Sequence, residues 1–346
     1  MNVFFRKRRP APAMTLEGVL GPNSRLDDAE GMTVVAPEAL CEAIDGRLLF
    51  SSGAQVLALG RWGEKPEEWA RFDAPVTALC RSAGGLVAVA LAGGRIFVLD
   101  AAGHSLDGWS LPAGRAAGVV DCLFRSETEL LVVDCGVAER DSLLAMAAWD
   151  EAHKGQVLSL RPSGEVRTAM TGLHYPTGIS LDAQGGLLVC LLEQAKIVNE
   201  AGAAVQSGYP GYLGRLRRTA TGYALACLSR RDPLIEFLKS EPRFIAEMKA
   251  KMPPKHWIGP RIDPQFSHDL PIALGATRLF GAVKPWAPSF SYGLVLNLDD
   301  KLLPTGSAQS RANGRRHAIC DTALWNGNMI AVSRASGELL NLGGNT

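Results

Sequence analysis

One short phrase recurs along the chain and constrains the fold more than any other feature of the sequence. Each copy has a turn, an apolar strand, a second turn and another apolar strand, and the spacing is roughly 35 to 60 residues, stretched once to about 105. The strand pairs lie at 45–50 and 55–59, 85–89 and 95–99, 130–133 and 156–160, 186–190 and 196–198, 222–226 and 292–296, and 327–332 and 338–340. Such a unit cannot bury both faces alone, so the copies must pack around an axis. The sequence therefore predicts an all-β, six-bladed β-propeller.

The domain organisation follows from this repeat. We expect a flexible basic tail at 1–14 and a single propeller domain at 15–346, in which a strand at 15–22 precedes the first blade and completes the last. The residues 136–153 form an Ala-rich insertion that reads as helical. A longer helical and irregular insertion at about 232–290 interrupts the fifth blade, because apolar residues recur there at helical spacing. Long insertions of this kind usually lie at one end of a propeller channel.

Composition excludes several classes of function. The net charge is +1 with no extended basic face, which argues against nucleic acid as a partner. No apolar stretch is long enough to span a membrane, and no apolar segment follows the basic N-terminus as in a secretory signal. The seven cysteines contain no C-x-x-C pair and lie on or beside predicted strands, so we expect buried, reduced thiols in a cytoplasmic protein, with one disulfide left open.

Four segments carry a resemblance to a known family. The run Gly172–Leu181, with its Leu-His-Tyr-Pro-Thr-Gly core, resembles a blade start of strictosidine synthase-like proteins, and so does Pro210–Leu216. Asp27–Gly31 is similar to the opening Pro-Glu segment of that family, and Ser229–Leu234 to its helical insertion. The superfamily also holds gluconolactonases and arylesterases. The resemblance implies a six-bladed propeller with a site at the channel mouth.

The same resemblance implies a degraded metal site. In metal-dependent relatives a Ca²⁺-like ion is held by a glutamate, asparagines and an aspartate, and hard cations require such oxygen ligands. Glu30 keeps the glutamate and Asp121 follows Val120 in the third blade, but Thr177 and Arg215 stand where relatives have asparagine. A guanidinium near the ion would repel it. We therefore expect no cofactor, with Ca²⁺ as the alternative.

The catalytic glutamate of strictosidine synthase itself is also missing. Its expected position falls on Leu324, and Asp321 is a nearby carboxylate only after a shift of register. The resemblance therefore does not support strictosidine synthase activity.

The remaining candidate site residues are expected to face the axis. The candidate catalytic groups are Glu30, Asp121 and His174, and the candidate ligand-binding groups are Thr177, Arg215 and Asp321. Structural roles are open for the same residues: Glu30 as a turn cap, Asp121 as an acceptor for backbone amides, and His174 packed beside Tyr175. Arg215 has one too, because it could pair with Glu30 or Asp121 and replace the metal.

Two function classes are open. The first is a propeller that binds a small organic ligand at the channel mouth and is possibly non-catalytic. The second is a lactone or ester hydrolase that uses Glu30 and Asp121, a hypothesis that rests on the superfamily alone. The oligomeric state and the identity of the ligand do not follow from the sequence.

Overall fold

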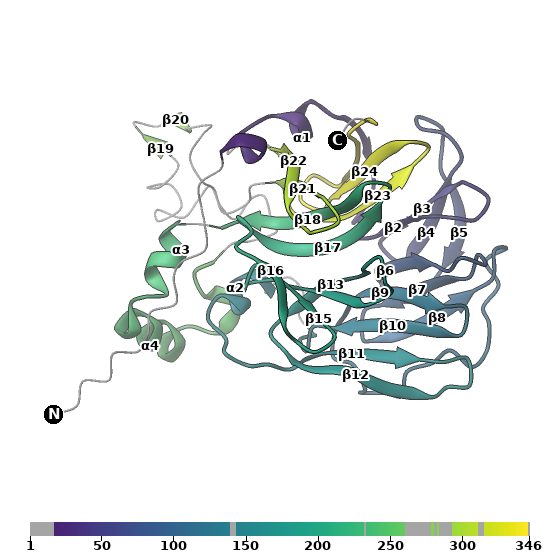
Figure 1. The fold of residues 1–346 in the computed structure, drawn as a ribbon, viewed down its shortest axis with the longest axis horizontal. Helices are drawn as coiled ribbons and strands as arrows, with labels where there is room; N and C mark the ends of the chain where they lie inside the picture. The colour runs from purple at the N-terminus through teal and green to yellow at the C-terminus, as the bar shows by residue number, and fades with distance from the viewer. Residues whose placement is uncertain are drawn as a thin grey trace.

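The repeated phrase forms the two middle strands of every blade. The computed structural model describes residues 17–138, 143–231, 233–259, 278–279, 282–283, 293–310 and 315–344. Its strands make six small antiparallel sheets arranged in a ring, and each strand pair predicted from the sequence lies at the centre of one sheet. The prediction of an all-β, six-bladed propeller is confirmed (Figure 1).

The first three blades follow one another along the chain, each starting with its innermost strand. Blade 1 contains β2 (Leu40–Glu42), β3 (Leu48–Ser52), β4 (Gln55–Leu59) and β5 (Glu67–Arg71). Blade 2 contains β6 (Val76–Arg81), β7 (Val87–Leu91) and β8 (Arg95–Leu99), and an isolated bridge between Leu99 and Ser105. Blade 3 contains β9 (Val119–Ser126), β10 (Glu129–Asp134), β11 (Gly155–Leu160) and β12 (Val166–Leu173).

The other three blades complete the ring. Blade 4 contains β13 (Pro176–Leu181), β14 (Leu187–Leu191), β15 (Lys196–Asn199) and β16 (Ala204–Ser207). Blade 5 contains β17 (Gly211–Thr219), β18 (Gly222–Arg230), β21 (Leu294–Leu298) and β22 (Pro304–Gln309). Blade 6 contains β23 (Ile319–Trp325), β24 (Asn328–Ser333), β25 (Glu338–Asn341) and, as its outermost strand, β1 (Glu30–Thr33).

Ring closure by an N-terminal strand is as expected, but the strand lies elsewhere. The predicted strand at 15–22 is wrong over its described part, where Gly18–Leu20 is a short 3-10 helix, η1. The closing strand is β1, which pairs antiparallel with β25. Between η1 and β1 lies the helix α1 (Arg25–Asp28), whose Leu26 is completely buried in an apolar cluster with Val295 and Leu340. The apolar residues at 15–22 favour a strand in the sequence. In the structure, the burial of Leu26 between blades 5 and 6 determines where the chain runs before β1.

Both insertions contain helices, and the long one also contains a short two-stranded sheet. The helix α2 (Leu143–Ala147) lies between β10 and β11, and α3 (Pro233–Leu238), α4 (Pro242–Lys251) and the 3-10 helix η2 (Pro254–His256) follow β18. Trp149, Ile235 and Met248 form an apolar cluster that joins the two insertions. A two-stranded sheet of β19 (Arg278–Leu279) and β20 (Ala282–Val283) follows in the long insertion.

Burial of the inner strands supplies the core. Val87, Val89 and Leu91 of β7 are almost completely buried, as are their counterparts in the other blades, as expected for sheets stacked face to face. No disulfide links any of the seven cysteines, all of which lie in the described part of the chain. None of the helices in the described ranges combines the length and the apolarity that crossing a bilayer requires.

Candidate functional site

The innermost strands of four blades bulge at their second residue. The pairing register shifts by one position in β6, β9, β13 and β23, which leaves one extra residue in each strand. The extra residues are Thr77, Val120, Thr177 and Cys320. A bulge takes its extra residue out of the ladder and re-aims the backbone groups beside it. In blades 2, 3 and 6 the freed carbonyl points at one side chain, that of Arg215.

Arg215 of β17 lies at the centre of the ring and is 2% exposed. Its Nε donates to the carbonyl of Val120 (3.1 Å), and Nη2 donates to the carbonyls of Thr77 (2.6 Å) and Val120 (2.8 Å). Its Nη1 donates to the carbonyls of Glu38 (2.5 Å) and Cys320 (3.3 Å). A guanidinium has five N–H donors, and Arg215 makes five such bonds, to blades 1, 2, 3 and 6. One side chain of blade 5 thus joins four other blades.

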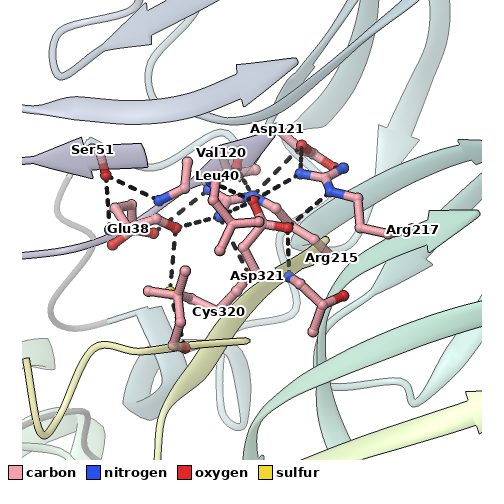
Figure 2. A network of polar contacts seen from close by, with 12 residues as sticks. Glu38, Leu40, Ser51, Val120, Asp121, Arg215, Arg217, Cys320 and Asp321 are labelled. Atoms are coloured by element: carbon pink, nitrogen blue, oxygen red, sulfur yellow. Dashed lines mark hydrogen bonds and ion pairs between the residues drawn. The ribbon is translucent and has the colours of Figure 1, made fainter. Parts of the chain in front are cut away.

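A second arginine, Arg217, lies two residues further along β17 and is clamped by two carboxylates (Figure 2). It donates Nη2 and Nη1 to Asp121 Oδ1 (2.8 Å) and Oδ2 (3.0 Å). It also donates Nε and Nη2 to Asp321 Oδ1 (2.8 Å) and Oδ2 (3.1 Å). Both carboxylates also lie beside Arg215, at 3.5 Å for Asp121 and 3.3 Å for Asp321. We call Glu38, Asp121, Arg215, Arg217 and Asp321 the axial cluster.

The two aspartates play the same structural part in opposite blades. Asp121 accepts the N–H of its own neighbour Cys122 and that of Ile179 in the next blade, at 3.0 and 2.9 Å. Asp321 accepts the N–H of Thr322 and that of Leu40 in the next blade, at 2.9 and 3.3 Å. Each carboxylate therefore pins its blade to the following one. All four carboxylate oxygens accept hydrogen bonds from an arginine and from a backbone amide.

Blade 4 approaches the cluster through small side chains. Thr177 donates its hydroxyl to the carbonyl of Leu213 at 2.7 Å. The adjacent Gly178 lies so close to β17 that a Cβ built on it would stand 2.6 Å from the carbonyl of Gly214 and 2.8 Å from the Cα of Arg215. A glycine is required at this position because no side chain fits. Thr177 consequently lies next to the cluster and contributes to strand packing.

Glu38 supplies the third carboxylate of the cluster. It lies two residues before the start of β2, and its carboxylate lies 3.6 Å from Arg215 Nη2 and 3.5 Å from Nε of Arg334, a side chain that is 25% exposed. Its backbone N–H is held by the hydroxyl of Ser51 at 2.9 Å. The five charges of the cluster sum to minus one, and Arg334 at its edge makes the group neutral.

The charges of the cluster keep both arginines ionised. Burial by itself lowers the pKa of a guanidinium, but the carboxylates of Asp321, Asp121 and Glu38 outweigh that effect and raise the pKa of Arg215 above its usual value. For Arg217 burial is again outweighed, by Asp121 and Asp321, and its pKa lies well above the usual range. Both side chains are therefore permanent cations.

Only part of the predicted site converges. Asp121, Arg215 and Asp321 meet at the axis as expected, with Thr177 beside them. The structural role expected of Asp121, accepting backbone amides, is present, and so is the ion pair between Arg215 and Asp121. The position that the resemblance gave to the strictosidine synthase glutamate is Leu324, which is 42% exposed.

Glu30 lies away from the axis, and His174 contacts the insertion between β10 and β11. The expectation that Glu30 faces the axis is wrong, because it lies on the outermost strand of blade 6, opposite Asn341. His174 packs against the ring of Tyr175, with centroids 4.9 Å apart, and donates Nε2–H to the carbonyl of Asp150 at 2.8 Å. This places His174 beside the insertion between β10 and β11.

Sequence reasoning missed two members of the cluster. Glu38 follows Pro37, and this Pro-Glu pair lies eight positions after the glutamate that the resemblance selected. Arg217 stands two positions after Arg215, and alternate residues of a strand share one face. Strand alternation was therefore a usable signal for Arg217, whereas the choice between two glutamates required the strand order.

The axial cluster does not fit a calcium ion. A hard cation requires six to eight oxygens at about 2.3–2.6 Å around one point, and here a guanidinium fills that point and takes up the carbonyls. At an effective dielectric constant of about 20, a unit cation 4 Å away repels another by roughly 4 kcal/mol, and a divalent ion doubles this. Among the residues that the structure describes, no group of three or more histidine, cysteine, aspartate or glutamate side chains has the geometry of a metal site.

Comparisons with known proteins find a solved structure with a similar fold. No family model matches the chain, and no match was found among curated proteins. A solved structure provisionally described as a gluconolactonase is similar over 91% of this chain and 91% of its own, with a TM-score of 0.52 and 12% identity. A nidogen–laminin complex aligns with 56% of this chain and 72% of its own at a TM-score of 0.43 and 13% identity, too low to carry an argument.

This likeness supports the coarser part of the resemblance. At 12% identity a shared fold is what the comparison establishes, and that fold is a gluconolactonase-like six-bladed propeller. The narrower assignment to strictosidine synthase-like proteins stays a prediction from the sequence motifs.

Proposed function

We propose that this chain is a non-catalytic propeller that binds a small organic ligand at the mouth of its channel, with Arg215 in the place of a metal. The observation that carries the proposal is the saturation of Arg215, whose five N–H donors all bind backbone carbonyls. Hydrolysis of a lactone or an ester requires an activated water, and a metal or an available base supplies it. The buried carboxylates Asp121 and Asp321 are each committed to arginine and to backbone amides.

The chemistry of the mouth favours an anionic ligand. Arg334 directly follows β24 of blade 6, lies beside Glu38, and at 25% exposure is the most exposed of the charged side chains that pair with the axial cluster. A guanidinium binds a carboxylate through paired hydrogen bonds, so a small organic acid is the class that suits this position. Thr177, Arg215 and Asp321 would then shape the floor beneath the ligand without touching it.

A ligand screen tests the proposal. Thermal unfolding is followed with lactones, esters and the corresponding open-chain carboxylates. We expect a saturable rise in Tm with a carboxylate, reduced in the variant Arg334→Ala. The matched control is Arg218→Ala, which removes an arginine paired with Asp300 on the surface. Equal effects of the two variants, or no stabilisation by any carboxylate, would contradict the proposal.

The alternative is a lactone or ester hydrolase that uses Glu30 and Asp121, and it is supported by the likeness of the fold. The position of Glu30 on the outer strand argues against this pair. Turnover assays of the same lactones and esters with added Ca²⁺, Mg²⁺, Mn²⁺ or Zn²⁺ separate the two functions. We expect no turnover above that of buffer, and metal-dependent turnover by the unmodified protein would put the hydrolase first.

A further inference from the structure

The carbonyl groups around Arg215 form a receptor that belongs to the backbone of the ring. Three of the four acceptor residues are bulge residues, Thr77, Val120 and Cys320, and the fourth, Glu38, lies two residues before an innermost strand. Bulges are built into strand register, so these carbonyls do not depend on Arg215 for their direction. Their positions come from blades that the ladder hydrogen bonds hold independently.

Negative charge adds to the receptor. The carboxylates of Glu38, Asp121 and Asp321 lie 3.6, 3.5 and 3.3 Å from nitrogens of Arg215. Removal of the Arg215 side chain would take one of the two arginines away from Asp121 and Asp321, and five hydrogen bonds to carbonyl groups would be lost. Buried acceptors that lose their donors destabilise the folded state.

We infer that the axis is a cation-binding site whose resident ligand is the guanidinium of Arg215, and that a free guanidinium ion binds there once this side chain is removed. The acceptors surround a planar group and meet nitrogens on its three sides, at 2.5–3.3 Å. A spherical ion would need the same oxygens to contract around one point. The inference uses the replacement of the metal by Arg215 from the proposed function, and it is independent of whether any ligand binds at the mouth.

Chemical rescue tests this inference. In Arg215→Ala the side chain is truncated at Cβ, and the variant is titrated with guanidinium chloride at low millimolar concentration by calorimetry and thermal unfolding. We expect one guanidinium per chain and a saturable rise in Tm. Urea is the matched neutral probe because it has the same planar shape without the charge, and sodium chloride controls for ionic strength.

The controls fix what would overturn the inference. The unmodified protein and Arg218→Ala should show no saturable binding, since their axial site is filled. Binding of urea equal to that of guanidinium, equal effects in all three proteins, or no binding to the folded Arg215→Ala would refute the site. Preferential binding of Ca²⁺ by Arg215→Ala would refute its planar geometry. Ligand screening at the mouth is unaffected by these outcomes.

A second pair of variants covers the case in which Arg215→Ala does not fold. Arg215→Lys keeps the cation with fewer donors, and Arg215→Met keeps an extended apolar side chain without charge. A cation site predicts that the free energy of unfolding falls in the order arginine, lysine, methionine. A methionine variant as stable as the lysine variant would show that filling the space is sufficient, and would overturn the inference.

Discussion

At the scale of single residues, each of the two axial aspartates bonds both to arginine side chains and to backbone amides. Asp121 and Asp321 are fully buried, and each holds two arginine nitrogens and two backbone amides. These bonds matter for the stability of the fold, because a buried charge that loses its partner is strongly destabilising. Surface ion pairs of the same composition contribute little.

The substitution Asp121→Asn measures this difference. It removes one of the two carboxylates that neutralise Arg217, so we expect the free energy of unfolding to fall by about 3–5 kcal/mol. The control Asp45→Asn breaks an exposed pair with Arg47, where a loss of at most about 1 kcal/mol is expected. Urea unfolding of the two variants gives the comparison, and equal losses would contradict a central role for the buried pair.

The close approach of blades 4 and 5 gives a second prediction at this scale. In Gly178→Ala the added methyl group meets backbone atoms of Gly214, Arg215 and Leu216 at 2.6–3.0 Å. We expect a loss of about 1–3 kcal/mol or more, since backbone on both sides resists displacement. Gly60→Ala is the control, because the nearest atom, on the flexible side chain of Glu64, is 3.4 Å away. A neutral Gly178→Ala would show that the strands separate easily.

Residue identities at the site were predictable only in part. Arg215, Asp121 and Asp321 follow from their places at starts of inner strands, and Arg217 from strand alternation. Glu30 was misassigned because two glutamates, eight residues apart, both precede small residues near the first blade. Which of them faces the axis depends on β1 pairing with β25, a contact between residues about three hundred positions apart that the local sequence does not encode.

At the scale of elements, a short segment before β1 fastens the two ends of the ring. Arg316, just before β23, donates Nη1 to the carbonyls of Leu26 (3.0 Å), Asp27 (3.1 Å) and Ala29 around the end of α1. Its Nε also pairs with Glu338 of β25 at 3.0 Å. Cations near the C-terminus of a helix satisfy its last carbonyls. This arginine therefore joins α1 and the pairing partner of β1.

The Arg316–Glu338 pair predicts a pH dependence of stability. Burial raises the pKa of Glu338, but the hydrogen bonds and charge of Arg316 outweigh it, so the pKa lies below its usual value. A depressed pKa means that the unfolded chain binds the proton more tightly. The stabilisation is therefore complete above the ordinary glutamate pKa and is lost as pH falls through the lower, folded-state value.

The variant Glu338→Gln isolates this contribution. We expect it to be less stable than the unmodified protein at pH 7, and the difference in the free energy of unfolding to shrink as pH falls below about 4.5. Glu67→Gln, at an exposed position of β5, serves as the control and should follow the unmodified protein. A difference that stays constant or grows at low pH would contradict the prediction.

The periodic pattern of the sequence predicts some elements of the fold and not others. All six strand pairs were predicted because apolar strands between turn glycines are a local signal. Blade 2 has an isolated bridge at Ser105 in place of a fourth strand. The segment 15–22, where a strand is predicted, contains the 3-10 helix η1 instead. Outer strands are half exposed, so their sequences carry little apolar pattern.

At the scale of the whole molecule, the ring is joined through its centre by protein groups. Blade 5 supplies two arginines, blades 1, 2, 3 and 6 supply the acceptors for Arg215, and blade 4 packs through Gly178 and bonds Asp121. The repeat predicts the propeller fold. For the centre of the ring, the sequence predicts only that Thr177 and Arg215 stand where the family that the chain resembles has asparagine. The bulges that aim the carbonyls appear in the pairing register and leave no mark in the sequence.

The central claim, that Arg215 stands in the place of an ion, is tested most directly by thermal unfolding of the unmodified protein in chelator and in excess Ca²⁺. An ion bound only to the folded state at one hundred times its dissociation constant would stabilise it by about 2.7 kcal/mol. The account predicts identical Tm values in both conditions and no calorimetric Ca²⁺ binding. A rise of Tm in Ca²⁺ together with one ion bound per chain would contradict it.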